Sequence, residues 1–204
     1  MENILLSTAY LPPISYLFAI NNADVFVIEQ WEHYQKQSYR NRCNIAAANG
    51  VMPMSIPVEH SSKEKTLTKD IRISPHGDWQ RQHWRSLVSA YNTTPFFEYY
   101  ADDFAPFYHK KYNFLLDFNT ELLQKILALF DIEKQLNFTT EYTVDYEEKA
   151  VDLRNEIHPK RIDNFVAKKY YQVFDQKNGF LPNLSSVDLL FNMGNEAQIV
   201  INKC

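Results

Sequence analysis

The sequence predicts an α/β protein that forms a single compact domain over residues 1–204. We expect a mixed sheet that begins with a βαβ unit, and aromatic-rich helices in the middle of the chain. Two apolar runs near the N-terminus flank a segment with helical spacing, and together they have the length of a βαβ unit. Aromatic residues make up 15% of the chain, and many of them lie between residues 79 and 130. A chain of 204 residues with 45% hydrophobic residues is long enough to bury one core.

The N-terminal unit follows from the pattern of apolar residues. Residues 4–10 read as a buried strand, which ends at two consecutive prolines. Apolar residues between positions 14 and 20 recur at helical spacing, and Asn21-Asn22 signals the end of that helix. A second buried strand is predicted over residues 24–29. We expect it to lie parallel to the first strand.

A hairpin is predicted next, around Asn49-Gly50, a pair that suits a tight turn. Pro53 and Pro57 cannot donate a ladder hydrogen bond, which predicts that the second arm of the hairpin is an edge strand. Residues 60–69 are polar and read as a loop, and residues 71–73 alternate as a short strand does.

The rest of the chain reads mainly as helices. Asp78 is expected to cap a helix that runs to Tyr91 with an apolar stripe on one face. Pro95 opens a second helix, and a third spans about residues 119–130. Residues 139–169 are highly charged and read as loop-rich. Residues 170–174 have the pattern of a strand, and residues 185–193 that of a short helix capped by Gly194.

Composition argues against several classes of function. A net charge of −4 and a pI of about 5.9 do not favour nucleic-acid binding. No stretch approaches the roughly 18 apolar residues of a membrane span, and no basic region of the kind that begins a secretory signal precedes the first apolar run. Two cysteines and the histidine spacing predict neither a disulfide framework nor a metal site, so we expect a cytoplasmic protein. Its four glycines are too far apart to form a phosphate-binding loop. The sequence indicates neither a cofactor nor an oligomeric state.

The segment directly after the second predicted strand is the first candidate site. Arginine offers a planar fork that grips carboxylate or phosphate, and lysine adds a compact charge. Because the whole chain is acidic, we interpret this segment as a local pocket for an anionic small molecule; the alternative is a solvated loop. Glu29, at the end of the preceding strand, is either a functional carboxylate or an ion-pair partner of Arg40 or Arg42. The segment consists of Lys36, Gln37, Ser38, Tyr39, Arg40, Asn41 and Arg42.

Histidines and one cysteine are further candidates. His33, His76 and His83 titrate near neutrality if unperturbed, and His83 lies on a predicted helix beside Trp84. A structural role is the alternative for each histidine. Cys43 follows a cation, which lowers a thiol pKa, although it also suits a small apolar core position.

Several blocks of the chain stand in an order and spacing that resembles the WbqC-like family. They are Tyr10-Leu11-Pro12-Pro13-Ile14-Ser15-Tyr16, the segment from Lys36 to Arg42, Asn49-Gly50, Ser55-Ile56-Pro57-Val58, Trp79, His83-Trp84, Tyr91 and Phe180-Leu181-Pro182-Asn183-Leu184-Ser185-Ser186-Val187-Asp188-Leu189-Leu190-Phe191-Asn192. Many members of that family carry His-Gln-Pro-Asn before the first block, where this chain has Leu6-Ser7-Thr8-Ala9. This chain therefore lacks the leading imidazole of that motif.

The resemblance implies a transferase of bacterial O-antigen and surface-polysaccharide biosynthesis, which attaches glycine or another acyl group to a sugar. Under this hypothesis the cationic segment holds a nucleotide sugar or an amino-acid carboxylate. The rings of Tyr10, Tyr16, Trp79 and Trp84 would stack on the sugar or base, and His83 or Glu29 would act as general base. The alternative hypothesis is a non-catalytic module that binds the same anionic ligand.

Overall fold

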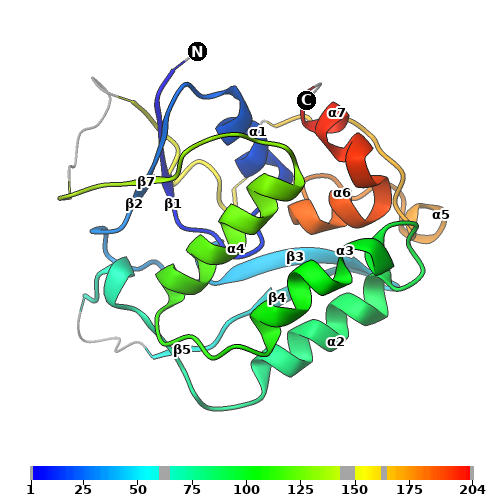
Figure 1. Ribbon diagram of the computed structural model, residues 1–204, viewed down its shortest axis with the longest axis horizontal. Coiled ribbons are helices and arrows are strands. Elements are labelled where there is room, and N and C mark those ends of the chain that lie inside the picture. Colours follow the sequence, from blue (N-terminus) through cyan, green and yellow to red (C-terminus); the bar gives the residue numbers. More distant parts are fainter. Residues whose placement is uncertain (1, 60–64, 143–149, 162–164, 203–204) are drawn as a thin grey trace.

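The computed structural model describes residues 2–59, 65–142, 150–161 and 165–202, and these form one compact α/β domain. The N-terminal strands, blue in Figure 1, lie at one side of the molecule, and the helices over residues 79–104, green, lie at the other. The predicted class is confirmed.

The chain begins with the predicted βαβ unit. It consists of β1 (Ile4–Ser7), α1 (Ile14–Asn22) and β2 (Phe26–Glu29), and the two strands pair in parallel from Ile4↔Phe26 to Ser7↔Glu29. All four residues of β1 are buried, so both of its faces are covered, as is usual in parallel sheets.

Two short strands complete this sheet, and the sequence prediction missed both. They are β7 (Asn137–Phe138) and β8 (Val151–Asp152), and the strand order is β7-β2-β1-β8 with every neighbour parallel. Each has only two residues, too few for an apolar pattern. Apart from β8, the described part of residues 139–169 is irregular, as predicted; residues 143–149 and 162–164 lie outside the described structure.

Antiparallel pairing occurs in two separate two-stranded sheets. The predicted hairpin is formed by β3 (Arg42–Ala47) and β4 (Gly50–Ser55), with Ala48-Asn49 as its loop. Of the predicted turn pair, only Gly50 has a positive φ, +106°. The second sheet joins β5 (Val58–Glu59) to β6 (Arg72–Ile73), which follows the short helix η1 (Thr68–Asp70). Residues 60–64 of the predicted polar loop lie outside the described residues.

Aromatic side chains pack between the helices in the middle of the chain. Phe118 contacts the rings of Tyr10, Trp79, Phe107 and Tyr112, at centroid distances of 4.9–6.4 Å. Of these rings, Trp79 lies on α2 (Trp79–Tyr91), Phe107 on η2 (Ala105–Tyr108) and Phe118 on α4 (Leu115–Leu129). Helix α3 (Phe97–Phe104) contributes two further rings, Phe97 and Phe104, which pack against Phe191.

Helix α4 begins four residues before the predicted start at Asn119. Asn119 resembles an N-cap in the sequence, but it lies inside the helix and is buried. Its Nδ2 donates hydrogen bonds to Thr8 Oγ1 (3.2 Å) and to the carbonyl oxygen of Arg40 (2.8 Å). This asparagine therefore links α4 to the residue that follows β1 and to Arg40, which lies ahead of the hairpin.

The predicted strand over residues 170–174 is wrong. Tyr170 and Gln172 are buried while Tyr171 is exposed, which produces the alternation of a strand. The segment nevertheless forms no ladder, because its hydrogen bonds involve side chains: Gln172 binds Leu181 through its amide, and the N–H of Val173 donates to Asn192.

The C-terminal part contains the predicted final helix, α6 (Ser186–Met193), which ends at Gly194 with a φ of +56°. A Cβ at Gly194 would stand 2.6 Å from the ring of Phe96, so this position requires glycine for space as well as for backbone conformation. The prediction missed three shorter helices, which are α5 (Asp175–Asn178), η3 (Gly194–Glu196) and α7 (Ala197–Ile201).

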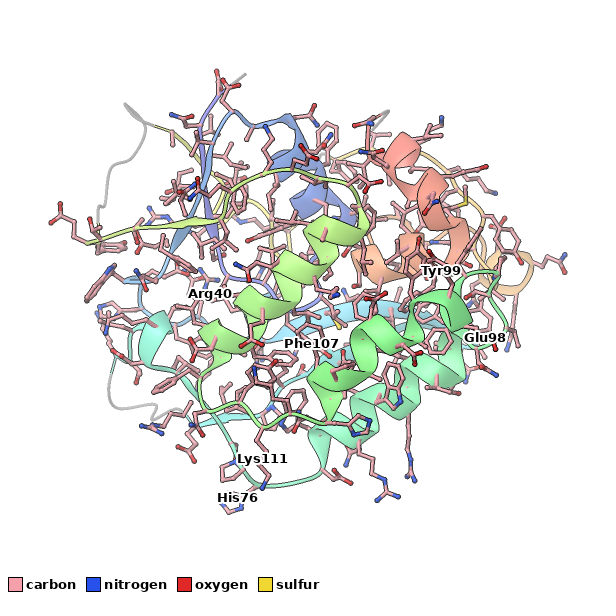
Figure 2. The ribbon with its side chains drawn as sticks, viewed as in Figure 1. Arg40, His76, Glu98, Tyr99, Phe107 and Lys111 are labelled. Atoms are coloured by element: carbon pink, nitrogen blue, oxygen red, sulfur yellow. The ribbon has the colours of Figure 1, made fainter. Side chains whose placement is uncertain are left out.

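Figure 2 shows how differently the labelled side chains are placed. Arg40 lies inside the molecule beside α4, whereas Glu98 and Tyr99 lie on the outer side of α3. The exposed fractions agree, at 1% for Arg40 and 75% for Tyr99. A residue of the predicted cationic segment is thus part of the interior.

Candidate functional site

The carboxyl ends of the four parallel strands meet at one edge of the sheet, and polar side chains gather there. In α/β proteins this edge is the usual place for a ligand. The residues concerned follow or end the strands: Ser7, Thr8, Glu29, Thr139, Asp152 and Arg154. The sequence placed only Glu29 of this set in the candidate site.

Glu29 is fully buried at the end of β2. Its Oε1 accepts hydrogen bonds from the backbone N–H of Trp31 (2.6 Å) and from the hydroxyl of Thr139 (2.8 Å). Its Oε2 has no hydrogen-bond partner, and the nearest cation is Arg154 Nη1 at 3.7 Å. Neither Arg40 nor Arg42, the partners expected from the sequence, forms an ion pair with it among the described residues.

Arg154 is the buried cation of this edge. Its Nη2 and Nε donate to Asp152 at 2.6 and 2.9 Å, and these bonds raise the pKa of the guanidinium. The pKa of Asp152 is lowered: burial favours its neutral form, but the Arg154 bonds outweigh that effect. The guanidinium also lies over the ring of Tyr142, 5.5 Å from its centre.

Arg40 is engaged in a second buried ion pair. Its Nε and Nη2 donate to the two carboxylate oxygens of Glu32 at 2.7 and 2.6 Å, a bidentate arrangement. Burial raises the pKa of Glu32, and the bonds from Arg40 oppose that shift. The planar fork expected to grip a ligand is therefore occupied by a carboxylate of the protein itself.

The loop over residues 30–41 is joined to the loop over residues 153–161. Lys160 Nζ donates to the side-chain oxygen of Gln37, and Gln35 donates to Asn155 at 3.1 Å. Lys36, at the exposed tip of the first loop, forms no ion pair within the part of the chain that the structure describes.

A cationic turn over residues 158–161 stands beside Arg40. His158 is half-buried, and its pKa is lowered by burial and by the positive charges of Arg40, Arg161 and Lys160. The sequence prediction missed this turn because it described residues 139–169 only as highly charged and loop-rich. The run His158-Pro159-Lys160-Arg161 was the signal that could have identified it, since it combines an imidazole and two cations with a rigid proline.

The remaining residues of the predicted cationic segment are hydrogen-bonded or packed within the protein. Asn41 donates to the carbonyl oxygen of Ile56 (2.8 Å), and Arg42 Nε donates to Ser55 Oγ (3.1 Å). Ser38 and Tyr39 are buried, and the carbonyl oxygen of Tyr39 accepts the N–H of Tyr10. Tyr16 is buried near Arg40 and Glu32, and its hydroxyl donates to the carbonyl oxygen of Ser7 at 2.8 Å.

His83 lies in a buried hydrogen-bonded chain, away from the strand ends. Its Nδ1 is 2.9 Å from the hydroxyl of Tyr10, which is 3.0 Å from the hydroxyl of Tyr108. A bond to the backbone of Ser55 raises the pKa of His83, but burial outweighs it and lowers that pKa to about 4. The imidazole is therefore neutral at pH 7, with both nitrogens engaged: Tyr10 donates to Nδ1, and the other nitrogen donates to Ser55.

The two predicted stacking tryptophans pack around this chain. The ring of Trp79 meets that of His83 edge-on at 5.2 Å, and Trp84 stacks on Tyr108 at 5.6 Å. Trp79 and Tyr10 are buried, while Trp84 is half-buried. Of the predicted residues, the structure thus brings Glu29, Tyr16 and Arg40 together at the strand ends, and Tyr10, His83 and the tryptophans together in the aromatic core.

Cys43 is fully buried in β3, and burial raises its pKa. The expectation that Arg42 lowers this pKa is wrong, because the thiol faces the core. Cys43 fills a small apolar position.

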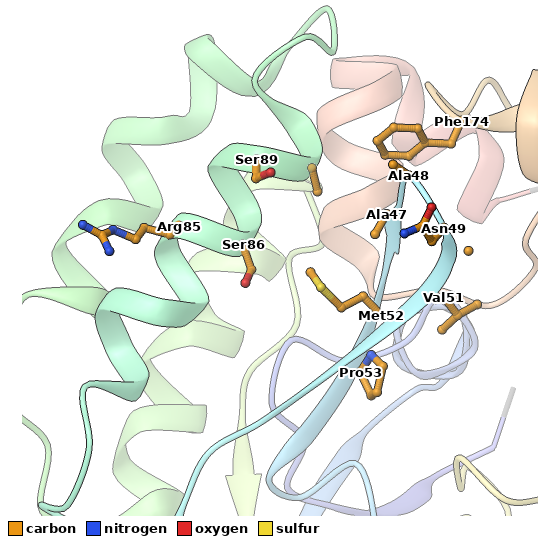
Figure 3. A pocket seen from close by; sticks show the side chains of 12 residues that line it. Ala47, Ala48, Asn49, Val51, Met52, Pro53, Arg85, Ser86, Ser89 and Phe174 are labelled. Carbon is orange, nitrogen blue, oxygen red and sulfur yellow. The ribbon is translucent and has the colours of Figure 1, made fainter.

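One cavity borders the groups at the strand ends, and a second lies at the hairpin. One of about 320 Å³ lies near the carboxyl edge and is lined by Trp31, His33, Leu67, Thr140, Glu141 and Tyr142. The other, about 610 Å³, separates the β3–β4 hairpin from α2. Figure 3 shows Met52 extending from the hairpin toward Ser86, while the guanidinium of Arg85 points away from the hairpin. His76 is exposed and lines neither cavity.

The described residues contain no cluster of three or more histidine, cysteine, aspartate or glutamate side chains arranged to hold a metal ion. A search of the same residues finds no helix with the length and apolar character needed to cross a membrane.

Comparison with known proteins gives one family and one relative. The model of the WbqC-like protein family matches residues 8–164. The chain is 27% identical over 221 aligned residues to the uncharacterized protein Rv1507c of Mycobacterium tuberculosis, and the alignment covers 96% of this chain and 95% of the relative. No solved structure matches.

Proposed function

Because the chain belongs to the WbqC-like protein family, we propose that it is a cytoplasmic transferase of bacterial surface-polysaccharide (O-antigen) biosynthesis. It attaches glycine or another acyl group to a sugar. The family resemblance supports the pathway, and the chemistry of the carboxyl edge supports the binding of an anionic ligand there.

The observation that carries this proposal is the gathering of cations around residues 158–161. Arg40 of the first loop and Lys160 and Arg161 of the turn surround His158, and Lys36 is the neighbour in sequence of Gln37, which accepts a hydrogen bond from Lys160. The ligand, a nucleotide sugar or an amino-acid carboxylate, binds between these loops. Cations gathered at one place bind an anion more strongly than the same cations spread over a surface.

Of the two residues expected to act as general base, Glu29 is the better candidate. Acyl transfer forms a bond between a sugar hydroxyl or amine and the carbonyl carbon, breaks the bond to the leaving group, and releases a proton from the attacking group. Glu29 Oε2 has no hydrogen-bond partner and can accept that proton. His83 has both ring nitrogens engaged, so it positions the hydroxyl of Tyr10 instead.

A ligand screen followed by a turnover assay tests the proposal. Nucleotide sugars and amino acids are tested for an increase in melting temperature, and the best ligand is then assayed for acyl transfer to a sugar. We expect Glu29→Gln to abolish turnover and to leave ligand binding largely intact. Full turnover in a folded Glu29→Gln protein would contradict the role of Glu29, and the absence of any ligand would contradict the site.

A non-catalytic binding module is the second candidate function. The observation that favours it is the complete burial of Glu29, together with the engagement of His83 by Tyr10 and Ser55. A module of this kind gives melting shifts with the same ligands and no turnover with any acyl donor. The two functions are therefore separated by the second step of the same experiment.

A further inference from the structure

The turn that carries His158 is built to hold its shape. The N–H of Arg161 donates to the carbonyl oxygen of His158 at 3.1 Å, which closes a four-residue turn with Pro159 at its second position. Proline fixes φ near the value that this position needs. The turn is anchored below by Ile157, which packs against the core, and at its side by Lys160, which donates to Gln37.

This turn selects one tautomer of the neutral His158 imidazole. Its Nδ1 accepts the backbone N–H of Lys160 at 3.2 Å, so the lone pair on Nδ1 is in use and the neutral ring carries its proton on Nε2. The groups facing it are cations from two elements: Arg40 from the first loop, and Lys160 and Arg161 from its own turn. These cations and partial burial disfavour a second proton on the ring.

The surrounding charges select the ligand. Arg40 is neutralised by Glu32, and Arg161 pairs with Glu156. Lys36 and Lys160 have no carboxylate partner within the described residues. Two ammonium groups without a carboxylate match the two negative charges of a phosphate better than the single charge of a carboxylate.

We propose that His158 is a ligand-binding residue whose neutral imidazole donates a hydrogen bond from Nε2 to an oxygen of a phosphate-bearing ligand held between residues 30–41 and the turn over residues 158–161. This deepens the proposed function, because it assigns the ligand of that site to the nucleotide-sugar class rather than the free amino-acid class. His158 does not act as a base here, because Nδ1 accepts the N–H of Lys160 and Nε2 already carries a proton.

Nitrogen-15 NMR of the full-length protein tests the contact directly. The ring signals of His158 are assigned by their loss in His158→Ala, and the protein is titrated at pH 7 with inorganic phosphate, pyrophosphate, acetate and glycine. We expect the Nε2 signal to shift saturably with phosphate and pyrophosphate while the ring remains neutral. Acetate and glycine should produce shifts only at much higher concentration.

Variants at the same position distinguish a donor from a base. Loss of a hydrogen bond to a charged group in His158→Ala should weaken pyrophosphate binding by about tenfold or more. His158→Gln keeps a neutral N–H donor at nearly the same reach, so it should bind within about threefold of the unchanged protein. Both variants are checked for an unchanged melting temperature without ligand, so that a loss of binding is not a loss of fold.

Three results would overturn this inference. The first is conversion of the ring to imidazolium on phosphate binding, the second is equal weakening in His158→Gln and His158→Ala, and the third is an equal response to acetate. None of these results depends on turnover. A protein that binds pyrophosphate through His158 but transfers no acyl group would retain the inference and lose the transferase assignment.

Discussion

At the scale of single residues, the buried charges decide what each side chain can do. Arg40 has the chemistry of an anion-binding residue, but Glu32 occupies its fork and both side chains lie in the interior. Exposed Lys36 and Lys160 retain their capacity to bind an external anion. Their ammonium groups do not face a protein carboxylate among the residues that the structure describes.

Arg40→Ala should destabilise the fold strongly, because it leaves the carboxylate of Glu32 buried without its partner. The expected loss in the free energy of unfolding is roughly 3–5 kcal/mol, measured by urea denaturation. Arg42→Ala is the matched control; its partner is the neutral hydroxyl of Ser55, so we expect a loss of about 0.5–1.5 kcal/mol. Replacing Arg40 and Glu32 together with Met and Leu should recover most of the stability, and a failure to do so would contradict the account.

His83 makes stability depend on pH in a defined direction. Its pKa is about 4 in the folded protein and near the ordinary 6.5 in the unfolded chain, so the unfolded chain binds the extra proton between these values. The stabilising contribution is therefore complete above pH 6.5 and is lost as the pH falls to 4. Its size is about 3 kcal/mol.

The contribution of His83 is isolated by measuring the free energy of unfolding against pH for the unchanged protein and for His83→Gln. Asp188 acts in the opposite direction, because burial raises its pKa to about 6 and its ionisation costs stability as the pH rises through that range. Both proteins contain Asp188, so its effect cancels in the difference between their unfolding free energies. We expect that difference to shrink between pH 6.5 and pH 4. A constant difference would mean that His83 is not buried as a neutral ring.

At the scale of elements, one carboxylate fastens four segments together. Asp188 on α6 accepts hydrogen bonds from Tyr91 on α2 (2.8 Å), Tyr170 (2.6 Å) and Gln172 (3.1 Å). The Tyr91 hydroxyl also accepts the N–H of Ala46 in β3 at 3.1 Å. The hairpin, two helices and the segment before α5 are thus held by one hydrogen-bonded group.

Tyr91→Phe should loosen this junction without changing the shape of the core. It removes a hydrogen bond to a buried carboxylate and leaves the Ala46 N–H unpaired, which should lower the free energy of unfolding by roughly 1.5–3 kcal/mol. Tyr99→Phe provides the control, since Tyr99 is 75% exposed and the same change there should stay within about 0.5 kcal/mol. Equal losses of stability in Tyr91→Phe and Tyr99→Phe would contradict the role of Asp188 in joining these elements.

At the scale of the whole molecule, the proposed site depends on two loops that are far apart in the sequence. Lys36 and Lys160 are brought to the same edge because β2 and β8 flank β1 in one parallel sheet. Neither lysine has a position in the core, so both can be removed with little effect on the fold.

The double substitution of Lys36 and Lys160 by Ala should therefore reduce anion binding without unfolding the protein. With pyrophosphate at about 100 times its dissociation constant, the unchanged protein gains about 2.7 kcal/mol of stability, and the variant should lose most of this gain. Lys177→Ala is the control, because Lys177 contacts Asn49 at the far hairpin turn. Melting temperatures with and without pyrophosphate measure both, and equal shifts in all three proteins would place the anion elsewhere.

Strong periodicity made the larger elements predictable. The βαβ unit, the hairpin and α6 were found because many residues repeat one pattern or because a glycine is required at a turn. Weak or competing signals caused the errors. β7 and β8 have two residues each, and the alternation of Tyr170 and Gln172 reflects side-chain bonds to Asp188 and Leu181 rather than a ladder.

Within the candidate site, the sequence by itself determined that cations follow β2 and that a carboxylate, Glu29, ends that strand. Residue identity and strand position are local properties, so both can be read from the sequence. Only the tertiary structure decided which cations face a ligand. Pairing Arg40 with Glu32, and bringing His158 and Lys160 beside Arg40 and Gln37, requires contacts between residues as much as 123 positions apart. No local pattern encodes such contacts, because they form only when distant segments pack together and the buried charges pair.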